Sequence, residues 1–349
     1  MPLVEIPGRA AGGDTGAAIA RGVDVAVSLT NARANQLDPR RFTQIACALA
    51  AELGLGVRVT DAVQLAEEGF GGIIAIGSGS SHPPSLVELW LPGEGPLGEE
   101  PPHGAIALAG KGITFDSGGL SLKDPSAMYS MHTDCAGAAT VLGALVALAE
   151  LGCTVPVYAA LPLAENMPGP EAIRPGDVVT MRSGVGLEII DTDFEGRVVL
   201  ADAVALLSES QPQAVITMAT LTYQAVVALG PEIAALLGRD AALTQRLLDA
   251  ADRADEALWP LPWADRYIAQ IRSNAPGAVY RNHPRADTGR ALTAALLLGE
   301  FLDPGIPFAH VDFAGPAVRM QDGGPVATGY GVRTLVELVT SWPASVDDR

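Results

Sequence analysis

Cysteine is scarce in this chain. The three cysteines, Cys47, Cys135 and Cys153, lie in apolar segments that have the character of helices or strands. Three cysteines placed in this way are too few for the disulfide framework that holds small secreted domains together. We therefore expect free, buried thiols.

Basic residues are also few. The chain has 22 lysine and arginine residues against 40 aspartate and glutamate residues, which gives a formal net charge of -18 at pH 7. A surface that binds nucleic acid or an anionic membrane needs a basic patch to neutralise phosphate groups. The charge balance therefore disfavours both kinds of partner.

Long apolar runs are missing as well. No uninterrupted apolar stretch reaches the roughly 18 residues of a membrane-spanning helix. The first five residues lack the basic and apolar parts of a signal peptide. We expect a cytoplasmic protein, and its 349 residues, 48% of them hydrophobic, are enough for a large core.

The apolar segments alternate between strand and helix character. This alternation predicts an α/β fold with a mixed central sheet flanked by helices. Residues 92–102 are predicted to form a turn-rich surface loop, and the glycines after strand 105–109 predict a glycine-rich loop there. Strands are predicted at 57–60, 86–91, 105–109, 155–161, 178–181, 187–190, 214–218 and 309–313, and helices at 42–53, 61–68, 136–151, 198–207, 243–252, 288–301 and 330–342.

Six charged side chains follow two of the predicted strands. Open α/β sheets bind ligands at the ends of their strands. Crowded carboxylates repel one another and take up protons unless a cation of higher charge lies among them. The set therefore points to metal-assisted hydrolysis. Its members are Lys111, Asp116, Lys123 and Asp134 after strand 105–109, and Asp193 and Glu195 after strand 187–190.

Each member of the set has an ordinary explanation when it is taken alone. Asp193 and Glu195 alternate across Phe194, so in an extended segment their side chains would face the same way, about 7 Å apart. Alone, such a pair is more often a solvated turn at a helix N-terminus. A lone lysine such as Lys111 is more often a surface group, and a lysine ligand needs a depressed pKa. Only the combination favours a metal site.

Two longer motifs contain most of the set. They read Gly110-Lys111-Gly112-Ile113-Thr114-Phe115-Asp116-Ser117-Gly118-Gly119-Leu120-Ser121-Leu122-Lys123 and Asp191-Thr192-Asp193-Phe194-Glu195-Gly196-Arg197. Together they resemble the signatures of the leucyl aminopeptidase (cytosol aminopeptidase) family. Weaker matches extend the resemblance over roughly residues 25 to 342. The resemblance implies a zinc-exopeptidase-like catalytic domain.

The family resemblance implies a dinuclear metal site. Asp116 and Glu195 match residues that bridge two metals, Asp193 matches a ligand of one ion, and Lys111 and Asp134 match ligands of the other. Two metals that share a hydroxide polarise the scissile carbonyl and can hold a free substrate amine. This implies an aminopeptidase that removes the N-terminal residue of a peptide or amino-acid amide. A ligand set without histidine discriminates poorly between metals, and we expect Zn or Mn.

The resemblance also implies roles around the metals. Lys123 matches a lysine that helps to stabilise the tetrahedral oxyanion, and Arg197 matches an arginine that holds a bicarbonate acting as general base. Met131 matches a residue of the pocket for the first substrate side chain, although methionine in an apolar segment equally suits core packing. The remaining pocket residues expected from the resemblance are Thr220, Leu221 and Tyr223.

The chain departs from the family pattern in several places. Most members carry a separate α/β domain before the signatures, so we expect residues 1–40 to be an N-terminal remnant or linker and residues 41–349 to be the catalytic domain. The family also implies a homohexamer of two trimers. Asp191 replaces an asparagine, Phe194 a small residue and Tyr223 a glycine, and a phenol there would shrink or polarise the pocket.

These departures keep two alternatives open. The first is a specialised biosynthetic amidase or dipeptidase that uses the same site. The second is a non-catalytic scaffold or DNA-binding relative, against which the intact ligand set and the acidic charge count. A serine-nucleophile role for Ser117 is disfavoured because no histidine and aspartate partners are evident. The five histidines are scattered without metal-ligand spacing.

Overall fold

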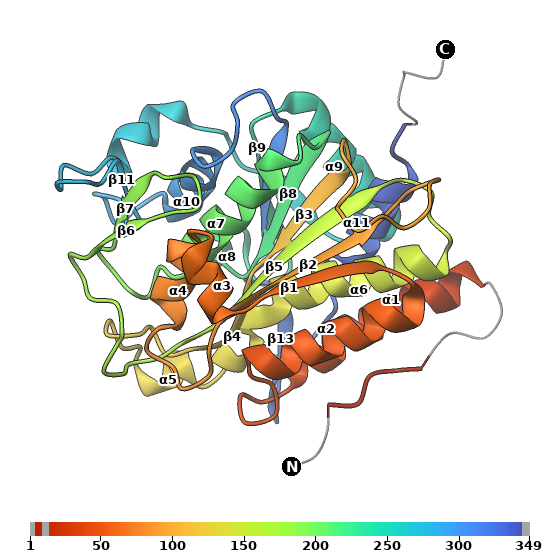
Figure 1. Cartoon of the computed structure of the whole chain (residues 1–349), viewed down its shortest axis with the longest axis horizontal. Coiled ribbons are helices and arrows are strands. Elements are labelled where there is room, and N and C mark those ends of the chain that lie inside the picture. Colours follow the sequence, from red (N-terminus) through yellow and green to blue (C-terminus); the bar gives the residue numbers. More distant parts are fainter. Residues whose placement is uncertain (1–3, 9–13, 344–349) are drawn as a thin grey trace.

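A nine-stranded mixed sheet forms the centre of the protein (Figure 1). The structure is a computed structural model that describes residues 4–8 and 14–343. The prediction that the first five residues are not a signal peptide depends partly on residues 1–3, which lie outside the described residues. The strand order is β1-β2-β5-β3-β8-β12-β9-β10, and β4 also pairs with β5. The strands are β1 Gly56–Thr60, β2 Ser85–Leu91, β3 Ile106–Gly110, β4 Gly112–Asp116, β5 Val157–Asn166, β8 Ala214–Ala219, β9 Ala234–Gly238, β10 Leu258–Pro260 and β12 Phe308–Asp312.

The middle of the sheet is parallel. β3 pairs in parallel with β5 on one side and with β8 on the other, and β8 pairs in parallel with β12. β1, β2 and β9 join through antiparallel pairs. The mixed sheet confirms the predicted fold class. The carboxyl ends of β3, β8 and β12 therefore lie at one edge of the sheet, where open α/β sheets bind ligands.

Helices cover both faces of the sheet. On one face α6 (Ala136–Glu150), α2 (Pro39–Leu53) and α9 (Ala241–Ala254) contact the sheet, and α1 (Thr15–Asn31) and α11 (Val332–Thr340) pack against α6. The other face carries α7 (Gly196–Glu209), which contacts α4 and α10. The remaining helices are α3 Ala62–Glu67, α4 Gly71–Gly77, α5 Pro125–Met128, α8 Tyr223–Leu229 and α10 Arg290–Gly299, and two 3-10 turns cover Met131–Cys135 and Asp265–Gln270.

The central helix α6 is apolar on all sides because protein surrounds it. With the preceding turn it forms a helical stretch, Met131–Glu150, that is long and apolar enough to cross a membrane. However, 94% of this window is buried inside the protein. This burial is that of a core helix.

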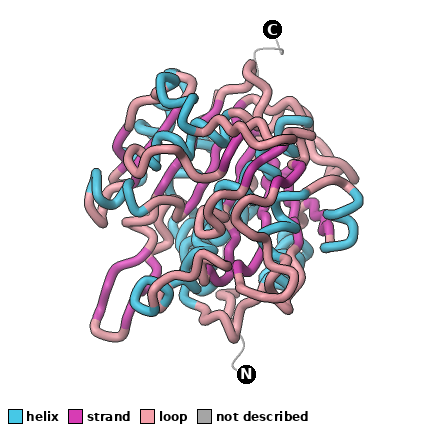
Figure 2. Tube along the Cα trace, turned by 90° about the vertical axis from the view of Figure 1, so that its left-hand side faces the viewer, coloured by secondary structure: helices cyan, strands magenta, loops and turns pink. Residues whose placement is uncertain are grey.

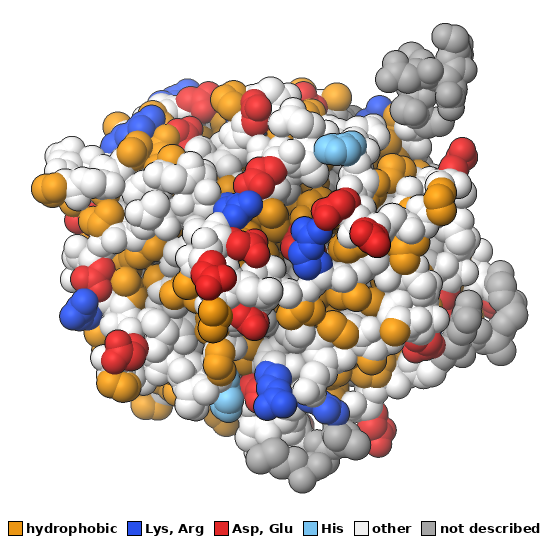
Figure 3. All heavy atoms as spheres, in the orientation of Figure 1, with side chains coloured by type: hydrophobic (Ala, Val, Ile, Leu, Met, Phe, Trp, Pro, Cys, Tyr) orange, Lys and Arg blue, Asp and Glu red, His pale blue; other side chains and the backbone are white. Residues whose placement is uncertain are grey.

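On the face shown in Figure 3, lysine and arginine side chains are scattered between acidic ones.

Most predicted elements are present, and several differ. Residues 112–116, which the glycines suggested to be loop, form strand β4, because the long strand β5 pairs first with β3 and then with β4. Residues 71–77, left without an assignment, form helix α4. Strands β9 and β10 were not predicted. Smaller sheets also form from β6 (Val178–Thr180), β7 (Gly186–Glu188) and β11 (Tyr280–Arg281), and from β13 (Val318–Gln321) and β14 (Gly324–Ala327).

The β13–β14 hairpin projects from the body of the protein (Figure 2). Most residues of β13 are exposed, among them Met320. At the other end of the chain, α1 packs along α6, and its Val25 and Leu29 are fully buried in the same core as α6. The division of the chain near residue 40 stays a prediction. The three cysteines are free, with Cys135 buried and the other two half-buried.

Candidate metal centre

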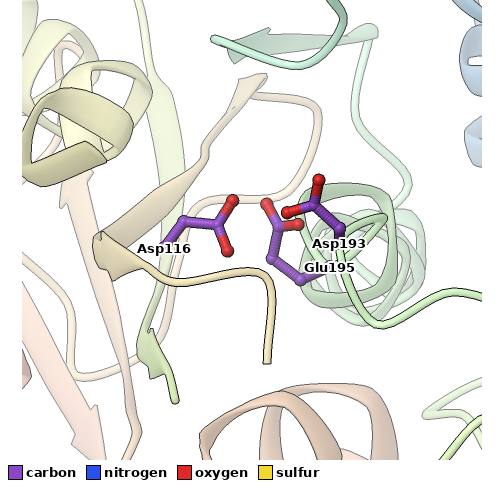
Figure 4. Close-up of side chains that lie close together, drawn as sticks. All are labelled: Asp116, Asp193 and Glu195. Carbon is purple, nitrogen blue, oxygen red and sulfur yellow. The ribbon is translucent and has the colours of Figure 1, made fainter. Parts of the chain in front are cut away.

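Three carboxylates converge at the carboxyl edge of the sheet. Asp116 is the last residue of β4, and Asp193 and Glu195 lie in the segment that leads into α7. Each of the three offers an oxygen atom, and these oxygen atoms all lie within 4.8 Å of one another. Figure 4 shows the three carboxylates facing one another, with Asp116 on one side and the other two on the opposite side. This spacing suits oxygen atoms that share one cation.

The segment that carries Asp193 and Glu195 is a turn that leads into α7, and not an extended segment in which the two side chains would alternate. The N–H of Phe194 donates to the carbonyl of Asp191 at 3.3 Å, and Glu195 already has helical backbone angles. The N–H of Asp193 donates to the Asp191 side chain at 2.9 Å. The turn, and not strand alternation, therefore brings Asp193 and Glu195 to the same cluster.

Lys111 lies between two carboxylates in the buried part of the site. It separates β3 from β4, and its Nζ is 2.7 Å from an oxygen of Asp134 and 2.7 Å from an oxygen of Glu195. Burial acts to lower the pKa of Lys111, but Asp134 and Glu195 outweigh burial and raise it. Thr220, at the end of β8, accepts from Lys111 Nζ through its carbonyl at 3.2 Å and donates its hydroxyl to Asp134 at 2.7 Å.

Lys123 also lies between two carboxylates, at the open side of the cluster. Its Nζ is 2.8 Å from an oxygen of Asp116 and also pairs with Asp193. The side chain is only 14% exposed. Four carboxylates, Asp116, Asp134, Asp193 and Glu195, therefore meet two ammonium groups, so the cluster keeps an excess of negative charge when all the acids are ionised.

This excess charge appears in the pKa values of the acids. Burial, together with the neighbouring acids, raises the pKa of Asp134 to about 8 and that of Asp193 to about 7. Burial opposes ionisation of Glu195 too, but Lys111 and Lys123 outweigh it and lower the pKa of Glu195. The raised pKa values show that ionisation of Asp134 and Asp193 is opposed by their surroundings, and a nearby divalent cation would favour it. The donor set fits divalent metal ions.

Buried polar residues that were given no role from the sequence hold the cluster in place. The amide of Asn166, at the end of β5, donates to Asp116 at 2.8 Å and to the carbonyl of Thr192 at 3.0 Å. The hydroxyl of Thr192 donates to the carbonyl of Gly118 at 2.6 Å. Asn282 accepts from the N–H of Ile190 and donates to the carbonyl of Asp191. The two motif segments are therefore tied to each other through these residues.

Two glycines of the motifs are required by close packing. A Cβ on Gly196 would lie 2.5 Å from the Cε of Lys111, so a larger residue at the start of α7 would displace the lysine. Gly118 has a φ of +87°, and a Cβ there would lie 2.9 Å from an oxygen of Asp193. Both positions show that the site leaves no room for side chains beside its charged groups.

Two cavities meet at the cluster. The larger, of about 700 Å³, is lined by all five predicted ligands, by Lys123 and by the predicted pocket residues Met131, Thr220, Leu221 and Tyr223. Its wall also includes Ala127, Val226 and Ala314. The smaller cavity has about 200 Å³ and shares Lys123, Asp193, Glu195 and Tyr223 with the larger one. The cluster therefore lies where the two cavities join.

Arg197 lies in the wall of the smaller cavity and not of the larger one. It is 2% exposed, and its Nε and Nη1 are buried without a hydrogen-bond partner among the described residues. Burial, together with the charge of Arg290, lowers its pKa to about 10, although Glu195 and Asp312 act in the opposite direction. Arg290, which was not predicted from the sequence, lines the same cavity.

The hydroxyl of Ser117 is used in a hydrogen bond to the backbone. Ser117 is buried, and its hydroxyl donates to the carbonyl of Asn166 at 2.7 Å. His310 is buried as well and pairs with the hydroxyl of Thr217 at 2.7 Å. No histidine is among the residues that line the two cavities.

Comparison with known proteins places this geometry in a family. A model described as the catalytic domain of the cytosol aminopeptidase family matches residues 24–336. The chain belongs to the cytosol aminopeptidase family. This membership confirms the resemblance that the two motifs suggested, and it identifies the α/β domain as the catalytic domain of a family of hydrolytic enzymes.

Curated members of the family match nearly the whole chain. The probable cytosol aminopeptidase of Corynebacterium diphtheriae is 40% identical over 336 residues, which cover 93% of this chain and 64% of that protein. The probable cytosol aminopeptidase of Roseiflexus castenholzii is 41% identical over 347 residues, 98% of this chain and 69% of that protein. The chain thus spans about two thirds of the length of these relatives.

Solved structures of one protein match the fold closely. The bottromycin maturation enzyme BotP in complex with Mn superposes with a TM-score of 0.86 at 40% sequence identity, covering 93% of this chain and 71% of that chain. A second structure of BotP gives a TM-score of 0.84. The agreement over nearly the whole chain confirms the mixed α/β architecture.

Proposed function

We propose that this protein is a metal-dependent aminopeptidase that removes the N-terminal residue from peptides. The observation that carries the proposal is the cluster of Asp116, Asp193 and Glu195, whose oxygens lie within 4.8 Å of one another beside Lys111 and Lys123. Membership of the cytosol aminopeptidase family supports it. The chain covers only part of the length of its relatives, so we infer the activity from the residues of its own site.

The residues of the cluster have distinct proposed roles. Asp116 and Glu195 would bridge two divalent ions, Asp193 would bind one of them, and Lys111 and Asp134 would bind the other. The bound ions would polarise the substrate carbonyl and make water a nucleophile at neutral pH. The raised pKa values of Asp134 and Asp193, and the excess of carboxylates over lysines, support this assignment.

Lys123 is proposed to stabilise negative charge on the substrate carbonyl oxygen. Its Nζ is held by Asp116 and Asp193, and its side chain lines both cavities, so it can reach a substrate that spans them. Neighbouring carboxylates raise its pKa above the ordinary value, which keeps the amine charged as a donor. A positioned cationic donor lowers the energy of an oxyanion because it needs no reorganisation during the reaction.

The larger cavity is proposed to take the first side chain of the substrate. Met131, Leu221 and Val226 give it apolar wall, and Tyr223 lies at its edge with 75% of its surface exposed. We expect Tyr223→Gly to widen acceptance of bulky first residues, because the phenol narrows the entrance. Relative kcat/KM for Ala, Leu, Phe and Trp amides measures this, and an unchanged profile would remove Tyr223 from the pocket.

The metals are proposed to be Zn or Mn. The oxygen-rich set with one amine discriminates poorly between divalent ions, and manganese is the ion in the complex of BotP. Arg197, buried with unpartnered N–H groups in the smaller cavity, is proposed to hold a bicarbonate that acts as general base. Rates measured with added and with removed bicarbonate test this role.

The decisive test of the activity uses free and blocked amines. The protein is stripped with a chelator, reconstituted with Mn or Zn, and given leucine amide and N-acetyl-leucine amide. We expect turnover of the free amine alone, lost with the chelator and restored by metal. Hydrolysis that persists without metal, or equal turnover of the blocked substrate, would reject the proposal.

A second candidate is an amidase or dipeptidase dedicated to a biosynthetic pathway. It is favoured by the similarity to BotP, which is a bottromycin maturation enzyme. A broad screen separates the two: a general aminopeptidase cleaves many free dipeptides, whereas a dedicated enzyme cleaves few.

We also propose a cytoplasmic location and a homohexamer. Exposed apolar residues such as Met320, Tyr129 and Leu122 offer contact surface for the homohexamer. Light scattering after gel filtration measures the assembly.

A further inference from the structure

Two arginines share one aromatic ring in the smaller cavity. The guanidinium carbon of Arg197 lies 4.5 Å from the centre of the Phe194 ring, and that of Arg290 lies 5.2 Å from it. Both side chains line the cavity. Both guanidinium groups thus lie close to one ring, and Arg290 acts to lower the pKa of Arg197 because their like charges repel. An anion bound near the two groups would relieve this repulsion.

Acids lie near this pair without pairing with Arg197: Glu195, Asp312 and Asp191 act to raise its pKa, but none forms an ion pair with it among the described residues. The Nε and Nη1 of Arg197 are buried and have no hydrogen-bond partner in the described part of the chain. Arg290 pairs through one terminal nitrogen with Asp287 at 2.9 Å, a side chain that is 83% exposed, and its Nε is buried and unpartnered. A surface pair of this kind neutralises little charge. Donors therefore remain for a planar oxyanion.

The acids of the same cavity are already engaged. Asp193 pairs with Lys123, and Glu195 pairs with Lys111. In addition, α7 begins at Gly196 in the cavity wall, and no side chain caps its first N–H groups. The positive end of a helix favours an anion nearby. The cavity wall thus carries three cationic side chains, Lys123, Arg197 and Arg290, against the two acids Asp193 and Glu195, although the chain as a whole carries a net charge of -18.

The position of the cavity indicates which part of a substrate it receives. The carboxylate cluster lies where the two cavities join, and the larger cavity has the apolar wall that suits a first side chain. A peptide cleaved at the cluster therefore places its leaving residue in the smaller cavity. Its volume of about 200 Å³ is suited to a single residue, not to a long peptide.

We infer that Arg290, which lines the smaller cavity beside the proposed bicarbonate site at Arg197, binds a carboxylate on the leaving residue of the substrate. This rests on the proposed aminopeptidase function and adds a substrate class to it: dipeptides with a free carboxyl group, or peptides with an acidic second residue. Arginine binds carboxylates through two parallel N–H bonds, which selects planar anions of this shape. The other source of a carboxylate-like anion is free bicarbonate, which the experiment distinguishes.

The test compares substrates that differ only in this charge. Leu-Asp-NH2 and Leu-Asn-NH2 form one pair, and Leu-Gly and Leu-Gly-NH2 form another. We expect the wild-type protein to favour the charged member of at least one pair in kcat/KM by about 10- to 100-fold, mostly through KM. In Arg290→Met this ratio should approach one, and Arg290→Lys should retain part of it.

The matched control is Arg246→Met. Arg246 also lies over an aromatic ring, 5.4 Å from the centre of Trp342, but it is exposed and outside both cavities. We expect this variant to keep the wild-type ratio. Because each ratio is measured within one protein sample, partial unfolding of a variant does not change it. A wild-type ratio near one in both pairs, or a ratio unchanged in Arg290→Met, would overturn the inference.

Bicarbonate gives a different pattern. If Arg290 serves bicarbonate held by Arg197, Arg290→Met lowers kcat equally for charged and neutral substrates, and added bicarbonate restores it. That outcome would overturn the assignment to the substrate carboxylate. A preference for the charged substrate that persists at saturating bicarbonate and is lost in Arg290→Met supports it.

A binding measurement separates failure of this inference from failure of the proposed activity. Leu-Gly analogues in which CH2–NH replaces the scissile amide cannot be hydrolysed, and both the free acid and the carboxamide are titrated calorimetrically into wild-type protein and Arg290→Met. Tighter binding of the free acid by roughly tenfold, lost in the variant, supports the inference even if no peptide is turned over. Equal binding of the two analogues to wild-type protein rejects it.

Discussion

The protein buries carboxylates in two different ways. Glu256, which follows α9, accepts hydrogen bonds from the N–H of Gly331 at 3.0 Å and from the N–H and hydroxyl of Thr334 at 3.0 and 2.6 Å. These donors belong to the first turn of α11, so Glu256 joins two helices and stabilises a helix N-terminus. At the metal centre, Asp116, Asp193 and Glu195 face one another, and their balancing charge comes from lysines.

The difference shows that burial alone does not mark a functional carboxylate. Glu256 is 6% exposed and Asp134 is 5% exposed, yet Glu256 is surrounded by fixed donors, whereas Asp134 has Lys111 and Thr220 as partners and also lies close to the acids Glu195 and Asp116. A carboxylate that accepts hydrogen bonds from fixed donors needs no further partner in the folded chain. A carboxylate that faces other carboxylates keeps a repulsive free energy that a cation can remove.

The largest effect should come from removing a carboxylate of the metal centre. We expect Asp193→Ala to lose bound metal and to lower kcat/KM by about a thousandfold, because the metal supplies several kcal/mol of transition-state stabilisation. Metal content by mass spectrometry and hydrolysis of leucine amide measure the two losses. A variant that keeps both its metal and its activity would contradict the site.

Metal removal should destabilise the protein through the same cluster. With free metal at about 100 times Kd, bound metal adds roughly 2.7 kcal/mol to the free energy of unfolding. Urea unfolding with metal and with chelator measures this difference. We expect it to vanish in Asp193→Ala and to persist in Glu256→Gln, and the reverse pattern would break the comparison between the two kinds of carboxylate.

Glu256→Gln should affect stability and not the metal. The substitution keeps the volume but turns one acceptor into an amide N–H2 that faces N–H donors, so we expect a loss of about 2 kcal/mol in the free energy of unfolding. Metal content should stay at the wild-type level. Loss of metal in this variant would mean that α11 and the metal centre are coupled.

Asp202 on α7 sharpens the comparison through pH. It is fully buried, accepts from the N–H groups of Ile73 at 3.0 Å and Arg182 at 2.8 Å, and has a pKa raised to about 7 by burial, which these N–H groups oppose. Because the folded pKa exceeds the ordinary value of 3.8, the folded state holds the proton more tightly. Its contribution to stability therefore falls as pH rises toward the folded pKa.

Between pH 6 and pH 7, the loss of stability that Asp202 causes amounts to about 1 kcal/mol in the free energy of unfolding. Asp202→Asn cannot titrate, so the unfolding free energy of the variant should fall less steeply with pH than that of the wild-type protein. Urea unfolding of both proteins at several pH values, in the presence of chelator, compares the two slopes. Equal slopes would show that the N–H groups keep Asp202 ionised throughout.

Much of the site is visible in the sequence because its residues cluster in two short motifs. Lys111, Asp116 and Lys123 are close along the chain, and so are Asp193, Glu195 and Arg197, and the structure brings them together. The local conformations were harder to predict. Glycines suggested that residues 112–116 are loop, but pairing with the second half of β5 makes them a strand.

Residues that act from elsewhere in the chain carry no such pattern. Asn282, Arg290 and Glu256 are single polar residues in ordinary surroundings, and their partners are distant in sequence. The spacing of a motif reports only on neighbours along the chain. A contact between α10 and the turn before α7 depends on how the helices pack over the sheet, so sequence periodicity does not contain it.

By itself, the sequence determined most of the order of strands and helices, the chemical types of the proposed metal-binding side chains and the family, since all of these follow from local patterns of apolar and charged residues. Only the tertiary structure decided that two lysines stand among four acids, that two cavities meet at this cluster, and that Arg290 joins Arg197 across one aromatic ring. These arrangements arise where strand ends, helix starts and loops from distant parts of the chain are packed at one edge of the sheet, and packing fixes their distances.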